Sequence, residues 1–244
     1  MGIQSKPMPR QARIRLPHTL MHIVQRGVNR SRCFYTSADR QIYLEWLEEL
    51  ADRFECAVHA YVLMTNHVHL LITPCDRDGV SLTMKNLGQR YVQYVNRVQQ
   101  RTGGLWEGRF RASFVDREYY LMCCYRYIEL NPVRAGLARH PGDYVWSSYR
   151  ANAEGLPSSL IKPHPVFQEL APTEDDRRRV YRDLFAEALE PSLIDDIRRL
   201  TNGGFAIGNE AFLEQAARVS GRRVIPGPRG PKPPAAPVVS LISE

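Results

Sequence analysis

Short runs rich in apolar, β-branched and aromatic residues alternate along the first 150 residues with longer stretches that repeat apolar residues at helical spacing. The short runs predict strands and the longer stretches predict helices. Ser37 or Asp39 is expected to cap the first helix. We expect strands at residues 20–26, 56–64, 67–73 and 110–116, and helices at about 37–54, 82–100 and 117–130. The order βαββαβ, followed by a helix, predicts an α+β fold with helices on one face of an antiparallel sheet.

The chain changes character after Tyr149. Residues 173–200 predict a strongly charged helix with runs of arginine, and a Gly-Gly pair then ends it. A further helix is expected at residues 210–219, stopped by Gly221. The end of the chain is proline-rich and basic, as mobile arms are. We therefore divide the chain into a domain of residues 1–150, a helical region of residues 151–221 and a mobile tail of residues 222–244.

The charge of the chain comes almost entirely from arginine. The formal net charge is +7, the sequence pI is about 9.3, and lysine occupies only positions 6, 85, 162 and 232. Arginine binds phosphate with two parallel hydrogen bonds and stacks on bases, so this surplus favours a nucleic-acid partner. A GC-rich genome would raise the arginine content without any functional reason.

Neither a membrane span nor a disulfide framework is expected. No apolar run approaches the roughly 18 residues that a span needs, and the basic N-terminus lacks the apolar segment of a secretion signal. The five cysteines are odd in number and include no C-x-x-C pair. A reducing cytoplasm fits this pattern best.

His67 and His69 lie two residues apart in a segment predicted to be a strand. Residues i and i+2 of a strand point to the same face, so the two imidazoles could share one divalent ion. Histidine in a strand is also often a hydrogen-bonded core residue or a half-exposed surface residue. The pair alone leaves these alternatives open.

Tyr127 and Asn131 are four residues apart, so on a helix they would lie on one face. A tyrosine hydroxyl beside a metal ion that holds a phosphodiester is a plausible nucleophile. The amide oxygen of Asn131 could complete the coordination, since Mg²⁺ and Mn²⁺ accept mixed oxygen and imidazole ligands. Alternatively, Tyr127 is a core residue, and Asn131 with Pro132 is an ordinary helix start.

Three separated segments, taken together, resemble the single-tyrosine HUH transposases, and most closely the REP-associated tyrosine transposases. They are residues 64–71, 105–110 and 127–136, and residues 20–30 also resemble the opening strand of that family. The resemblance covers roughly residues 15–150, in the same order. It implies a ferredoxin-like sheet, which agrees with the predicted element order, and it makes residues 1–150 the catalytic domain.

The resemblance also implies roles for individual residues. His67 and His69 would bind a divalent metal, Mg²⁺ or Mn²⁺, and Tyr127 would be the nucleophile. Asn131 matches the third ligand, although other HUH branches have glutamine or histidine there. Such enzymes cleave single-stranded DNA and form a 5′-phosphotyrosine and a free 3′-OH, which can later rejoin strands. The implied partner is single-stranded or hairpin DNA, bound by a monomer or homodimer. We expect the protein in a bacterial cytoplasm, associated with the nucleoid.

Further residues are candidates for DNA contacts. Arg109 and Arg111 could hold phosphate on one strand face, or could be ordinary solvated charges. Arg134 follows the proposed site and could clamp a phosphate. Trp106 could stack on a base or be part of the core, and His22 could belong to the core or contact substrate.

Several alternatives remain open. Tyr119, Tyr120 and Tyr125 are rival nucleophiles, and Tyr125 has Glu129 four residues on. The chain could instead be a domesticated, non-catalytic nucleic-acid binder on the same fold, a metal-dependent hydrolase that uses water, or an RNA-binding module. Residues 190–220 could form a helix-turn-helix that reads a hairpin stem, or a clasp that packs on the catalytic domain.

Overall fold

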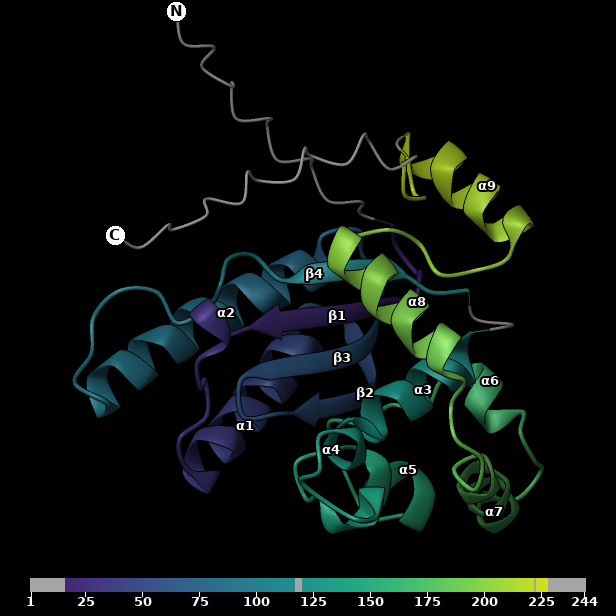
Figure 1. Cartoon of the computed structure of the whole chain (residues 1–244), viewed down its shortest axis with the longest axis horizontal. Helices are drawn as coiled ribbons and strands as arrows, with labels where there is room; N and C mark the ends of the chain where they lie inside the picture. Colours follow the sequence, from purple (N-terminus) through teal and green to yellow (C-terminus); the bar gives the residue numbers. More distant parts are fainter. Residues whose placement is uncertain (1–15, 117–119, 222, 228–244) are drawn as a thin grey trace, which may run out of the picture.

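The computed structural model describes residues 16–116, 120–221 and 223–227 (Figure 1). In this part of the chain, four strands form one antiparallel sheet in the order β2-β3-β1-β4. The strands are β1 (Met21–Arg26), β2 (Cys56–Leu63), β3 (His67–Pro74) and β4 (Arg111–Phe114). This is the ferredoxin-like order, so the predicted α+β class and antiparallel sheet are confirmed.

Helices α1 (Ser37–Arg53) and α2 (Gly79–Val98) cover one face of the sheet, behind the strands in Figure 1. Val68, Leu70 and Ile72 of β3 point into this core, which also holds aromatic side chains of both helices. The predicted cap of α1 is wrong. Thr36 caps the helix, and Asp39 completes a capping box by accepting from the Thr36 backbone.

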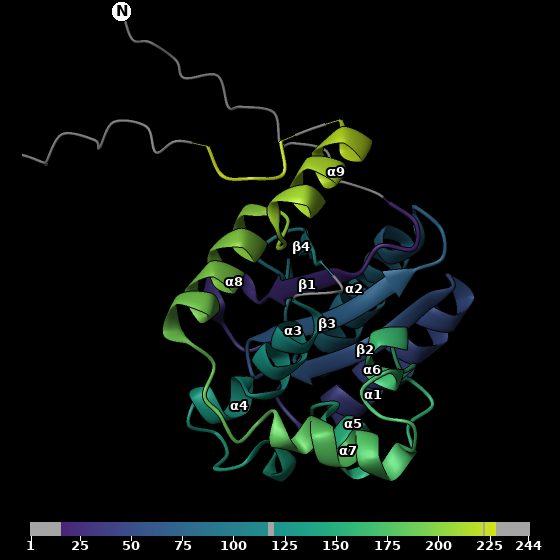
Figure 2. The same cartoon turned by 90° about the vertical axis from the view of Figure 1, so that its right-hand side faces the viewer.

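The opposite face carries α3 (Leu121–Glu129), α4 (Asn131–Arg134) and α8 (Pro191–Gly203) (Figures 1 and 2). Helix α3 packs on β2 and β3, whereas α8 packs on β1 and β4. Because side chains alternate along a strand, the odd-numbered residues of β3 face these helices. The register places His69 opposite Val24 of β1, and His67 opposite Arg26.

The predicted charged helix of residues 173–200 is two helices, α7 (Glu174–Asp183) and α8. Pro191 is the first residue of α8, a position where proline suits a helix start but cannot continue a preceding helix. Gly204 ends α8 with φ of 67°, in the left-handed region that favours glycine. Helix α9 (Glu210–Ser220) ends at Gly221, as predicted.

The remaining elements are short: η1 (Val28–Arg30), η2 (Pro141–Asp143), α5 (Tyr149–Glu154) and α6 (Pro165–Gln168). None of the helices in the described part is both long and apolar enough to cross a membrane. The division of the chain at residues 150 and 221 stays a prediction. Most of the proposed tail, residues 222 and 228–244, lies outside the described residues.

Candidate active site

The two histidines of β3 form the centre of the candidate site. His67 and His69 lie on the same sheet face with ring centroids 4.9 Å apart. Nδ1 of His67 is 2.7 Å from Oδ1 of Asn66, and Nδ1 of His69 is 2.8 Å from Nε2 of His22. With both Nδ1 atoms engaged, Nε2 of each ring is the atom available to a ligand.

Both imidazoles are neutral at physiological pH. Burial, together with the charge of Arg26, lowers the pKa of His67 to about 4, and Asn131 acts in the opposite direction. Burial also holds the pKa of His69 well below its ordinary value, and neighbouring histidines and arginines act in the same direction. A histidine binds a metal ion only in its neutral form, so these pKa shifts prepare the pair for that role.

His22 lies beneath the pair, in the protein interior. It is fully buried, its ring stacks on His69 at 5.1 Å, and its Nδ1 is 3.0 Å from Oγ1 of Thr201 in α8. Burial lowers the pKa of His22 to about 3. Of its two predicted roles, the structure places His22 in the core, where it orients His69 rather than facing solvent.

Tyr127 meets the histidines from α3. Its ring centroid is 5.6 Å from those of both His22 and His69, and the residue is only 4% exposed. Burial raises the pKa of the Tyr127 phenol, and Arg134 and Arg198 partly oppose the increase. The Arg134 guanidinium lies over the ring, 4.5 Å from its centroid, and donates to the Tyr127 carbonyl oxygen.

Asn131 reaches the site from a different helix than the sequence predicts. Helix α3 ends at Glu129, and Asn131 is the first residue of α4. The cap of α4 is Leu130, so the alternative in which Asn131 caps the helix is wrong. The Asn131 side chain acts to raise the pKa of His67, and its Nδ2 is buried with no hydrogen-bond partner in the described part of the chain.

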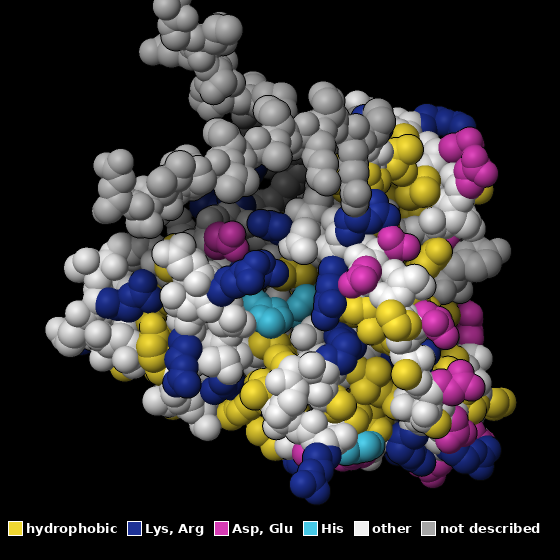
Figure 3. Space-filling model, viewed as in Figure 1, with side chains coloured by type: hydrophobic (Ala, Val, Ile, Leu, Met, Phe, Trp, Pro, Cys, Tyr) yellow, Lys and Arg dark blue, Asp and Glu magenta, His cyan; other side chains and the backbone are white. Residues whose placement is uncertain are grey.

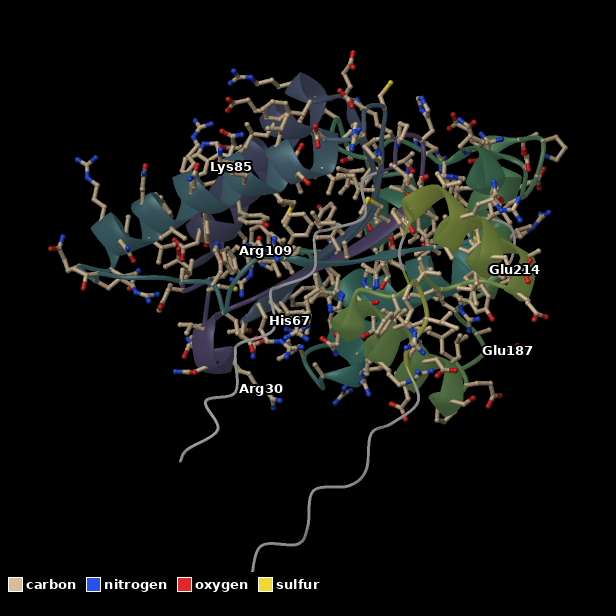
Figure 4. The ribbon with its side chains drawn as sticks, turned by 90° about the horizontal axis from the view of Figure 1, so that it is seen from above. Arg30, His67, Lys85, Arg109, Glu187 and Glu214 are labelled. Carbon is tan, nitrogen blue, oxygen red and sulfur yellow. The ribbon has the colours of Figure 1, made fainter. Side chains whose placement is uncertain are left out.

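Positive charge gathers around the histidines. Figure 3 shows Lys and Arg side chains around the histidine patch, and in Figure 4 His67 lies between Arg30 and Arg109 in this view. A small hollow beside Val24 is lined by Arg26, Arg109 and Arg111, together with Glu107 and Asn202. Arg109 precedes β4 rather than lying on it. Arg111 donates to Oδ1 of Asn202 at 2.9 Å.

Trp106 is not brought to the histidines. Its ring stacks on Tyr91 of α2, with centroids 6.0 Å apart, in the core on the other face of the sheet. Its indole Nε1 is buried without a hydrogen-bond partner among the described residues. This position matches the core alternative for Trp106, and a role in base stacking stays a prediction.

The rival tyrosines lie elsewhere. Tyr125 is fully buried against Phe167 and Tyr181, and Tyr120 stands at the start of α3. Tyr119 lies outside the described residues. Glu129 is buried too, and accepts hydrogen bonds from Ser148, Asn152 and Tyr181. Burial raises its pKa to about 7, against the hydrogen bonds that lower it.

Sequence reasoning missed two residues of the site, both on α8. Thr201 contacts His22, and Arg198 acts to lower the pKa of the Tyr127 phenol. Arg198 stands out in the sequence only as part of a charged run, and Thr201 only as part of a helix end. Only the three-dimensional structure identifies them, because each lies more than 70 residues along the chain from the residue it affects.

The donor set is compatible with a divalent cation that accepts nitrogen and oxygen ligands together. Two neutral imidazoles lie here beside the amide of Asn131, whose oxygen could serve as a third ligand. Among the described residues, no three His, Cys, Asp or Glu side chains group as they would around a metal ion. A site of this kind would therefore depend on Asn131 and on ligands brought by the substrate.

Comparisons with known proteins give a consistent family and fold. Residues 16–131 match the family described as "Transposase IS200 like". The fold is similar to that of a REP-associated tyrosine transposase bound to a REP hairpin, with TM-score 0.52 and 17% identity, over 64% of this chain and 93% of that one. A candidate transposase from Deinococcus radiodurans shares 17% identity over 50% of this chain and 96% of its own, but its TM-score of 0.36 carries no argument. No curated protein matches the chain.

Proposed function

Because residues 16–131 match the IS200-like transposase family, we propose that this chain is a DNA strand transferase that acts through Tyr127. The observation that carries this proposal is the position of Tyr127. Its ring contacts that of His69, one of a pair of neutral histidines, and the Arg134 guanidinium lies over it. A nucleophile, a candidate metal site and a cation for the phosphate thus meet at one place, as phosphoryl transfer requires.

The proposed reaction exchanges one phosphodiester for another. The Tyr127 hydroxyl oxygen attacks a phosphorus atom of single-stranded DNA, and the bond from phosphorus to the 3′ oxygen breaks. The phenol loses its proton, the departing oxygen gains one as a free 3′-OH, and the 5′ end stays on Tyr127 as phosphotyrosine. Attack of a 3′-OH on this linkage reverses the step and rejoins DNA. Each step exchanges one phosphodiester bond for another, so no water is consumed between cleavage and rejoining.

A divalent metal ion fits this proposal. His67 and His69 would hold it through Nε2, and Asn131 through its amide oxygen. When bound, Mg²⁺ or Mn²⁺ would polarise the attacked phosphate. The protein's own groups position the reactants: the buried wall around Tyr127 limits its motion, and the hydrogen bond that His69 donates to His22 fixes the His69 ring.

We further propose that the DNA backbone crosses the arginine-lined hollow before it reaches Tyr127. Arg26, Arg109 and Arg111 would bind phosphates there, and Arg134 would contact the reacting phosphate. Two nitrogens of Arg134, Nε and Nη1, are buried without partners among the described residues, which supports a role in binding an anion. The related structure contains a REP hairpin, so hairpin-forming repeats are the proposed substrate class.

The test is covalent capture. The full chain is incubated with Mn²⁺ and a labelled single-stranded oligonucleotide that carries a hairpin and a degenerate flank, and then run on a denaturing gel. We expect a protein–DNA adduct that disappears in Tyr127→Phe and persists in the matched control Tyr120→Phe. An adduct that survives Tyr127→Phe but not Tyr120→Phe would move the nucleophile to Tyr120.

Two other outcomes separate the alternative functions. Hairpin binding without any adduct would favour a non-catalytic DNA binder on the same fold. A hydrolase that uses water as its nucleophile would cleave the oligonucleotide without forming an adduct. Its cleavage would survive Tyr127→Phe and would be lost in His67→Ala.

A further inference from the structure

The turn that follows β1 keeps an unusual backbone conformation close to the candidate site. Asn29 and Arg30 are consecutive non-glycine residues with φ of 51° and 58°, in the left-handed region where a side chain crowds its own backbone. The turn is also tightly closed, since a Cβ atom on Gly27 would meet the Ser31 carbonyl oxygen at 2.2 Å. A strained backbone of this kind persists only where the surrounding structure holds it, and such strain is concentrated at functional sites.

Hydrogen bonds from two neighbouring segments hold this turn. Nδ2 of Asn66 donates to the Arg30 carbonyl oxygen at 3.0 Å. From the other side, the Leu105 carbonyl oxygen accepts from the Val28 N–H at 2.9 Å. The segment that begins at Leu105 continues to Arg109 in the arginine-lined hollow. The turn and the hollow are therefore joined through backbone hydrogen bonds, and the position of the turn is fixed before any partner binds.

The turn exposes a charged side chain that the protein does not use internally. Arg30 is exposed, and within the described residues its guanidinium forms no ion pair or hydrogen bond. Arg111 of the hollow, by contrast, already donates to Asn202. Figure 4 shows Arg30 on the other side of His67 from Arg109. A guanidinium on a fixed backbone, without an acidic partner, is well suited to bind an external anion.

We propose that Arg30 binds a phosphate of the single-stranded part of the DNA, on the opposite side of the histidines from Arg109. This inference rests on the proposed function and adds a contact to it. The strand would pass the hollow, cross the histidines and leave over the turn, so that a guanidinium holds the backbone on each side of the reacting phosphate. Because the turn is already fixed, binding would order little more than the Arg30 side chain itself.

Replacing Arg30 by glycine tests this contact with little risk to the fold. Glycine adopts the left-handed conformation of this position readily, so Arg30→Gly should keep wild-type stability in urea unfolding. Arg53→Ala is the matched control. Arg53 is also an exposed arginine without an ion pair among the described residues. It lies three residues before Cys56, which pairs with Pro74 at the end of the sheet opposite His67.

The experiment measures the affinity for a labelled single-stranded oligonucleotide by fluorescence anisotropy over a range of salt concentrations, with EDTA present. Arg30→Gly should weaken binding about 10-fold at low salt, as expected for the loss of one charge-assisted hydrogen bond. The slope of log K against log salt should become shallower by about 0.7, because one phosphate contact fewer is made. Arg30→Lys should keep the wild-type slope, since lysine retains the charge. Arg53→Ala should match wild type in both quantities.

A blunt hairpin without single-stranded flanks separates the two parts of the substrate. Its affinity should be the same for wild type and Arg30→Gly, and a loss as large as that on the single strand would overturn the proposal. Unchanged affinity and salt slope of Arg30→Gly on the single strand, or an equal loss in Arg53→Ala, would overturn it too. The proposed function fails separately, if wild type binds the strand with this dependence on Arg30 but forms no adduct with Mn²⁺.

Discussion

Replacing His22 by phenylalanine should weaken Mn²⁺ binding about 10- to 100-fold, the usual effect of losing a hydrogen bond that orients a ligating histidine. For His69 to bind metal through Nε2, its Nδ1 must carry the proton and donate to Nε2 of His22, 2.8 Å away. Nδ1 of His22 then donates to Thr201 at 3.0 Å. Phenylalanine keeps the buried ring that stacks on His69 but removes both hydrogen bonds. The loss corresponds to about 1.4 to 2.7 kcal/mol of binding free energy.

The substitution should also lower the free energy of unfolding, because it leaves two buried polar groups unpaired at about 1–3 kcal/mol each. His59→Phe is the control. His59 is buried and contacts Lys162 and Thr73 at 2.6 and 2.9 Å, away from the site. Both variants should lose comparable stability in urea unfolding, while only His22→Phe should lose Mn²⁺ affinity by electron paramagnetic resonance. Wild-type affinity in His22→Phe, or an equal loss in His59→Phe, would refute the orienting role of His22.

Three further outcomes are expected from buried groups. Burial lowers the pKa of His59 from 6.5 to about 4, so its stabilising effect is complete above pH 6.5 and is lost as pH falls. Between pH 7 and 5, the unfolding free energy of His59→Gln should therefore fall by about 2 kcal/mol less than that of wild type, measured by urea titration. An equal dependence of unfolding free energy on pH in the two proteins would contradict this. Burial raises the pKa of Glu129 from 4.5 to about 7, so its stabilising effect is complete below pH 4.5 and is lost as pH rises. Glu129→Gln should gain roughly 3 kcal/mol relative to wild type between pH 4.5 and 8, measured in the same way. Trp106→Ala should cost about 3–5 kcal/mol of stability with unchanged affinity for single-stranded DNA by fluorescence anisotropy, and a selective loss of affinity would restore the base-stacking role.

The sequence predicted the parts of the site that depend on local periodicity. The two-residue spacing of His67 and His69 puts them on one face of a strand whatever the rest of the chain does. Helix spacing was a weaker guide for Asn131, because the chain leaves α3 before that residue and begins α4. The side chain still reaches His67, since Leu130 keeps near-helical backbone angles.

The contributions of α8 could not be predicted from the sequence. The contact of Thr201 with His22 joins residues far apart in the chain, and so does the effect of Arg198 on the pKa of Tyr127. Both depend on how a whole helix packs on a sheet. Pro191 could have indicated that residues 173–200 contain a helix start, yet the strong charge pattern on both sides concealed the break. The capping box of α1 was missed by one residue, because Thr36 and Asp39 act as a pair.

Backbone segments that follow residue 131 lie beside both edges of the sheet, at β2 and just after β4. Ile161 and Ser147 lie beside Val58 and Val62 of β2, and Ile207 lies beside Val115 just after β4. Exposed edge strands present unpaired N–H and C=O groups that can pair with other chains. A protein truncated after residue 131 should therefore self-associate by strand addition, even though it retains all four strands, both histidines and Tyr127. In the full chain the bridges at Val58, Val62 and Val115 occupy part of both edges, which leaves less of each edge open to a second copy.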